Sequence, residues 1–202
     1  MHQNLNFKTD IVPFLIATIG EFIALHYWLT YMDLGNLLLA NLLLWVGFGI
    51  ERGSVAVWVK KVYRPKEGIT GTNVPVWQQI LGWGFITFTE ILIWIVWYYS
   101  IDRLGYMGST AILYGLMLIQ HSAELGLVKR KNIFSHTLDL KTHFFTLMEV
   151  LGAVGWIYYH QQGDNHWAML CLLIGLSIEH IIEGSSLKPE NVERVSPPPS
   201  VP

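Results

Sequence analysis

The stretch 146–156, TLMEVLGAVGW, is the starting point for interpreting this chain. It places a glutamate in an apolar segment, three residues after a threonine and seven residues before a tryptophan. The same spacing occurs in 18–28, TIGEFIALHYW, and in 87–97, TFTEILIWIVW. Spacings of three and seven residues bring the side chains to one face of an α-helix. A pattern that occurs in three apolar segments indicates an internally repeated helical protein.

The three patterned segments belong to a chain that is unusually apolar along its whole length. Its 202 residues are 52% hydrophobic and only 14% charged, whereas a soluble domain carries roughly 25% charged residues. A membrane-spanning helix needs about 20 mostly apolar residues. We therefore predict an all-α integral membrane protein, a bundle of six transmembrane helices, at Ile11–Met32, Leu34–Ile50, Val76–Tyr99, Met107–Val128, Leu140–His160 and Trp167–Ile182.

The connections between these runs alternate in charge. Those after the first, third and fifth runs are short and contain a single basic residue, Arg103. The connection after the fourth run contains Lys129–Lys131, and that after the second contains Arg52, Lys60, Lys61, Arg64 and Lys66. Because basic loops stay in the cytoplasm, both termini are predicted to be cytoplasmic. We expect a multi-pass protein of a bacterial cytoplasmic membrane.

Two segments are expected to lie outside the spanning helices. The segment at about 54–63 mixes valines and a tryptophan with two lysines, which is typical of a helix that lies along the membrane face. Residues 188–202 end in SPPPSVP and cannot form a packed core, so they are predicted to be a disordered cytoplasmic tail. Residues 1–187 then form one six-helix domain.

Each even-numbered run ends near a glutamate that is followed within two residues by a glycine. The positions of these glutamates predict three related helical hairpins, each with two carboxylates at about the same depth, in the pairs Glu21 with Glu51, Glu90 with Glu124, and Glu149 with Glu183. An ionised carboxylate at the centre of a bilayer costs at least about 2.5 kcal/mol. No lysine or arginine is expected at that depth, since Arg52 is assigned to a cytoplasmic helix end. Protons, metal ions or histidines must then neutralise the carboxylates.

Two of the even-numbered runs also carry a His-x-x-Glu motif, which places both side chains on one helix face. The motifs are His121 with Glu124 and His180 with Glu183, whereas Phe48 takes the place of the histidine in the second run. The sequence therefore predicts a metal site of Glu90, His121, Glu124, Glu149, His180 and Glu183. This set resembles the ligands of carboxylate-bridged di-iron bundles, which draw one glutamate from each of two helices and a Glu/His pair from each of two others. The order within the pair is reversed here, so the resemblance is to a ligand set and not to a family.

Carboxylate and imidazole donors suit iron or manganese. Supporting or proton-handling roles are expected for Glu21, Glu51, Gln120, His143 and Glu179. A simpler interpretation has Glu51, Glu124 and Glu183 facing the lipid headgroups. The tryptophans at 28, 97 and 156 are most simply anchors at the outer membrane interface.

Three functions remain open from the sequence. The first is a metal-dependent membrane oxidoreductase that activates oxygen or a lipid-soluble substrate, and its catalytic residues are not identified. The second is a proton- or cation-coupled transporter or channel, since buried acidic residues and structural repeats are typical of both. The third is a haem- or pigment-binding subunit that works with other membrane subunits. The formal charge of −2 gives no indication of nucleic-acid binding, and the single cysteine, Cys171, excludes an internal disulfide and a cysteine-ligated metal site.

Overall fold

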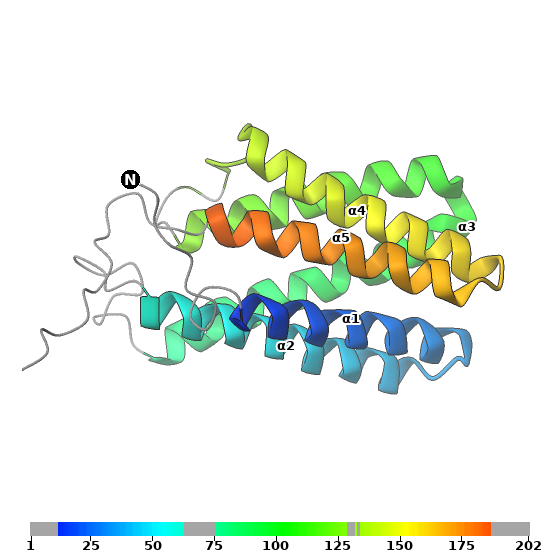
Figure 1. Cartoon of the computed structure of the whole chain (residues 1–202), viewed down its shortest axis with the longest axis horizontal. Coiled ribbons are helices and arrows are strands. Elements are labelled where there is room, and N and C mark those ends of the chain that lie inside the picture. Colours follow the sequence, from blue (N-terminus) through cyan, green and yellow to red (C-terminus); the bar gives the residue numbers. More distant parts are fainter. Residues whose placement is uncertain (1–11, 63–75, 129–131, 133, 187–202) are drawn as a thin grey trace, which may run out of the picture.

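The computed structural model describes residues 12–62, 76–128, 132 and 134–186, and these residues form an all-helical bundle. The described helices, shown in Figure 1, are α1 (Val12–Asp33), α2 (Leu37–Val62), α3 (Val76–Val128), α4 (Leu140–Gln161) and α5 (Asn165–Ser186). Four stretches are long and apolar enough to cross a membrane, at 12–33, 37–55, 81–126 and 165–184. The chain is thus an all-α protein of membrane character.

Helix α3 is kinked at Gly105, whose backbone has φ 67° and ψ 178° and is not helical. Figure 1 shows that α3 doubles back at this point, at the same end of the bundle as the α1–α2 and α4–α5 turns. Gly35 and Gly163, in those two turns, also have positive φ angles of 72° and 77°. A positive φ favours glycine because a side chain would clash there. Six separate spanning helices and their relation as repeats stay predictions.

The α1–α2 and α4–α5 turns are built alike. The N–H of Asn36 donates to the carbonyl of Tyr31 at 2.8 Å, and the N–H of Asp164 donates to the carbonyl of Tyr159 at 2.9 Å. This bond over five residues closes the end of a helix around a left-handed glycine. The Asn36 and Asp164 side chains then accept bonds from backbone N–H groups of the next helix, at 3.3 and 3.2 Å. The same local chemistry therefore reverses the chain twice.

Small residues let the helices of each pair approach closely. A Cβ atom built on Gly175 of α5 would stand 2.7 Å from the Cα of Gly152 of α4. A Cβ on Gly47 of α2 would stand 2.0 Å from the Cβ of Ala24 of α1. Close backbone contact through small residues is the usual way in which helices associate inside a membrane. These contacts fix how α1 faces α2 and how α4 faces α5.

Four tryptophans pack together inside the bundle. The four side chains, which we call the tryptophan layer, are at most 1% exposed and belong to Trp28, Trp94, Trp97 and Trp156. Trp94 contacts all three others, with ring centroids 6.5 Å from Trp28, 5.5 Å from Trp97 and 6.5 Å from Trp156. The expectation that residues 28, 97 and 156 anchor the membrane interface is therefore wrong. Their indoles fill the space between helices because each lies on the helix face that turns inward.

Polar contacts join the helices at the end of the bundle where the two hairpin turns lie. The Asp33 carboxylate at the end of α1 lies 2.7 Å from Nε2 of His160 in α4. It also accepts a hydrogen bond of 3.1 Å from the hydroxyl of Tyr98 in α3. Asp33 and His160 are partly exposed, with 45% and 25% of their side chains accessible. The Asp33 side chain thus links α1, α3 and α4 at the turn end of the bundle, beyond the tryptophan layer.

Two predicted segments can be compared with the structure only in part. The segment at about 54–63 is continuous with α2, which runs as one helix to Val62, and Val55 within it is fully buried. Residue 63 and the proposed disordered tail at 188–202 lie outside the described residues. The same is true of Arg64, Lys66 and Lys129–Lys131.

Candidate metal centre

Among the described residues, seven glutamate side chains are buried inside the bundle. Each residue is at most 4% exposed, and they are Glu21, Glu51, Glu90, Glu124, Glu149, Glu179 and Glu183. We call them, together with the buried Arg52, His121 and His180, the carboxylate cluster. Glu21, Glu90 and Glu149, the glutamates of the repeated pattern, all face inward. The simpler interpretation, in which Glu51, Glu124 and Glu183 face lipid headgroups, is wrong because all three are enclosed by protein.

Arg52 lies inside the cluster and binds three of its carboxylates. Its Nη1 donates to Oε1 of Glu124 at 2.6 Å and lies 2.9 Å from Oε1 of Glu51, while its Nη2 donates to Oε2 of Glu90 at 2.6 Å. The side chain is 6% exposed. The expectation that no basic side chain reaches the carboxylates, and the placement of Arg52 in a loop, are therefore wrong. Because α2 continues past Glu51, the guanidinium stays within the bundle and joins α2 to both halves of α3.

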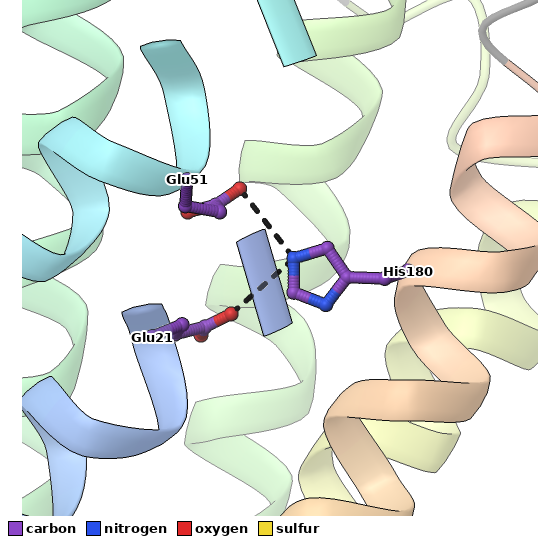
Figure 2. A group of neighbouring side chains, drawn as sticks. All are labelled: Glu21, Glu51 and His180. Carbon is purple, nitrogen blue, oxygen red and sulfur yellow. Dashed lines mark ion pairs between the residues drawn. The ribbon is translucent and has the colours of Figure 1, made fainter. Parts of the chain in front are cut away.

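His180 points one ring nitrogen at two carboxylates. Its Nε2 lies 3.5 Å from Oε2 of Glu21 and 3.8 Å from Oε1 of Glu51, as Figure 2 shows. Its Nδ1 lies 2.8 Å from Oε2 of Glu179 and 2.9 Å from the carbonyl oxygen of Leu176. A metal-binding histidine typically donates its second ring N–H to a carboxylate or a backbone carbonyl. The ring of His180 is held in this way, with Nε2 directed into the cluster.

His121 is oriented in a similar manner from the second half of α3. Its Nδ1 lies 2.8 Å from the Thr146 hydroxyl, and its Nε2 lies 3.3 Å from Oε2 of Glu149. The ring also packs edge-on against Phe145, with centroids 4.8 Å apart. The threonine of the repeated pattern in α4 thus holds a histidine, whereas the Thr18 hydroxyl donates to the carbonyl of Phe14. The threonine of the pattern therefore has a different hydrogen-bond partner in α1 than in α4.

Two groups of side chains within the described residues have donor atoms close enough to share a metal ion. The first is Glu21, Glu51 and His180, and the second is Glu21, Glu90 and Glu149. Within each group one donor atom from every residue lies within 4.8 Å of the others. Glu21 belongs to both groups. Of the six residues predicted as ligands, the structure brings Glu90, Glu149 and His180 into these groups, with His121 beside Glu149.

The other predicted residues have different surroundings. Glu124 is bound by Arg52 through one oxygen, and its Oε2 has no hydrogen-bond partner among the described residues. Oε1 of Glu183 and both amide atoms of Gln120 are likewise buried without a partner there. His143 is half-buried, and its Nδ1 lies 2.5 Å from the hydroxyl of Tyr114. Glu179 contacts His180, as a supporting residue would.

Sequence reasoning missed Arg52 and underrated Glu21 and Glu51. Arg52 directly follows Glu51, which the sequence places at the depth of the other carboxylates. This adjacency is the signal that indicates a basic side chain near the carboxylates. It was overlooked because basic residues near a helix end usually mark the cytoplasmic loop. Glu21 and Glu51 were set aside because Phe48 replaces a histidine in α2, yet His180 supplies the imidazole from α5.

Comparison with protein-family models, with curated proteins and with solved structures finds no match to this chain.

Proposed function

We propose that this chain is an integral membrane metalloprotein whose carboxylate cluster holds redox-active metal ions, and that it acts as an oxidoreductase. The observation that carries the proposal is the charge of the cluster. Within the described residues, seven buried carboxylates face one guanidinium and two cluster histidines. Two carboxylates about 5 Å apart repel by roughly 3 kcal/mol at an effective dielectric constant of about 20. Bound cations would remove this repulsion.

The donor types favour iron or manganese. Carboxylate oxygens and imidazole nitrogens bind both metals, and both can change oxidation state. The two histidines direct Nε2 at carboxylates while Nδ1 is held by Glu179 or by Thr146. A lipid-soluble substrate would reach such a centre from the bilayer, and dioxygen, which is also apolar, would do the same.

We further propose that the chain crosses the membrane six times, with both ends in the cytoplasm. A straight helix of 53 residues would be about 80 Å long, at about 1.5 Å per residue. The hydrocarbon core is only about 30 Å thick. The kink at Gly105 supports two passes for α3, and the contact of α4 with α5 supports a further pass for α4. Protease protection of the Gly105 turn in sealed inside-out vesicles tests this topology, and cleavage there would contradict it.

A proton- or cation-coupled transporter is the second candidate. The observation that favours it is that Glu51, Glu124 and Glu183 each have a buried carboxylate oxygen without a hydrogen-bond partner in the described part of the chain, since bound protons would satisfy these oxygens as well. A haem site has less support, because Nε2 of both cluster histidines faces a carboxylate within 3.8 Å. A porphyrin would have to separate these groups.

The test is the metal content and visible absorption of the purified protein. We expect tightly held iron or manganese without a Soret band, and a loss of metal in His121→Ala and His180→Ala. His166→Ala, at an exposed position near the start of α5, is the matched control and should keep the metal. Wild-type protein without tightly held metal, or full retention in both cluster variants, would overturn the proposal in favour of a proton path. A Soret band would favour the haem site.

A further inference from the structure

We propose that the centre is dinuclear and that the carboxylate of Glu21 bridges its two cations. This inference rests on the proposed function and specifies the site more closely. One cation lies among Glu21, Glu51 and His180, and the other lies among Glu21, Glu90 and Glu149. Glu21 is the residue shared by the two donor groups.

The spacing of the donor atoms fits bound ions better than direct hydrogen bonds. His180 Nε2 stands 3.5 and 3.8 Å from its two carboxylate neighbours, which is long for a hydrogen bond between nitrogen and oxygen. Two ligands that each lie about 2.1 Å from an ion are about 3.0 Å apart at octahedral angles and about 3.4 Å apart at tetrahedral angles. Small adjustments of side chains that already face one another would therefore complete the site, as the arrangement in Figure 2 illustrates.

A second observation, independent of the acidic cluster, points to a ligand between these groups. His180 is 1% exposed, and its Nδ1 is already held by Glu179 and by a backbone carbonyl. Its Nε2, at the other end of this oriented ring, is aimed between Glu21 and Glu51. Oε2 of Glu51 is buried there without a hydrogen-bond partner among the described residues. An oriented imidazole beside an unsatisfied carboxylate oxygen is an arrangement that a cation completes.

Arg52 limits the number of cations. The guanidinium binds one oxygen of Glu51 and one of Glu90, so it touches one ligand from each donor group. It also binds Glu124, which belongs to neither group. Four carboxylates in the donor groups match the charge of two divalent ions, and Arg52 offsets Glu124. Glu179 and Glu183 lie outside this balance. The fixed guanidinium thus supplies one positive charge that a metal ion does not have to supply.

The experiment uses Mn²⁺ as the probe and the full-length protein in detergent. Metal stoichiometry is measured after loading and desalting, and the electron paramagnetic resonance spectrum reports magnetic coupling between ions. Glu21→Gln removes the bridge at almost constant shape. Asp33→Asn is the matched control, because it makes the same change of a carboxylate to an amide at the other end of the bundle, outside the carboxylate cluster.

We expect two Mn²⁺ per chain with a coupled spectrum in the wild type and in Asp33→Asn. Glu21→Gln should retain at most one ion and should show the spectrum of isolated Mn²⁺. Size-exclusion chromatography identifies the folded fraction on which each measurement is made. One ion per wild-type chain, two uncoupled ions, or a coupled pair in Glu21→Gln would overturn the bridge and leave the metalloprotein standing. A wild type without metal would instead overturn the proposed function itself.

Discussion

The carboxylate cluster and the tryptophan layer occupy the same bundle, about 10 Å apart along the helices, and they are stabilised in opposite ways. The distance follows from the spacing of glutamate and tryptophan in each pattern, in which the tryptophan is the seventh residue after the glutamate, at about 1.5 Å per residue. In the tryptophan layer, broad rings meet at centroid distances of 5.5 to 6.5 Å. In the cluster, Arg52 and two histidines stand among seven carboxylates. The tryptophan layer is stabilised by the packing of its rings, whereas the carboxylate cluster needs a balance of charge.

The difference explains how a bundle can tolerate so many buried carboxylates. Packing between helices, rather than transfer from water, holds membrane helices together, because lipid is as apolar as the protein core. The tryptophan layer and the close contact of Gly152 with Gly175 supply that packing on the turn side of the cluster. The carboxylates are therefore positioned by neighbours that do not depend on their charge. This separation leads to four predictions, from the largest expected effect to the smallest.

Replacing Arg52 with methionine should be the most damaging single change. The substitution keeps an unbranched side chain but leaves Glu51, Glu90 and Glu124 without their counter-ion, and breaking a buried ion pair on one side costs roughly 3–5 kcal/mol. The free energy of unfolding, measured by denaturant titration in mixed micelles, should fall by that amount. Adding Glu124→Gln to Arg52→Met should restore part of the loss. An Arg52→Met protein as stable as the wild type would show that the guanidinium is not needed.

Removing Trp94 tests the tryptophan layer alone. Trp94→Ala should reduce the free energy of unfolding by roughly 3 kcal/mol, because the cavity it leaves cannot close completely. The folded fraction should still bind metal, because the ring contacts of Trp94 with Trp28, Trp97 and Trp156 are contacts within the tryptophan layer. Trp167→Ala, at a position 55% exposed, is the control and should change stability by less than about 0.5 kcal/mol. Loss of metal from folded Trp94→Ala would link the two regions.

Changing Glu179 tests the support of His180 without removing a proposed ligand. Glu179→Gln should weaken metal binding by about 10- to 100-fold, which is the usual effect of losing such a supporting carboxylate. Competition with a chelator measures this change. Ser177→Ala, on the same helix, serves as the control, because its hydroxyl donates only to the carbonyl of Leu173 in the described contacts. Unchanged affinity in Glu179→Gln would remove the role assigned to the His180–Glu179 contact.

The smallest effect is expected at the turn end of the bundle. Asp33→Asn should weaken the contact with His160 and lower the free energy of unfolding by about 0.5–1 kcal/mol, because partly exposed ion pairs contribute little. Asp102→Asn, an exposed position in the middle of α3, is the control and should have no measurable effect. Equal losses in the two variants would indicate a general effect of charge. A loss as large as that of Arg52→Met would contradict the contrast between buried and exposed charge.

The sequence by itself determined the helical class, the membrane character and the inward direction of Glu21, Glu90 and Glu149. These features follow from local composition and from the helical period, which the Thr, Glu and Trp spacing carries directly. Helix bounds were close where an apolar run ended at a glycine turn, as at Gly35 and Gly163. The predicted end of α2, at Ile50, differs from the observed end at Val62. Nothing in the local pattern distinguishes a helix end that is buried in the bundle from a helix that lies along the membrane face.

Only the tertiary structure decided which charges meet. Whether Arg52 points to the cytoplasm or into the bundle depends on the rotation of α2 against α3, which is set by contacts between residues far apart in sequence. The same is true of His180, which reaches Glu21 and Glu51 in the first two helices rather than only its own motif partner. Spacing along one helix fixes which side chains share a face. It does not fix which faces of different helices come together, and that is what places a histidine and an arginine among these carboxylates.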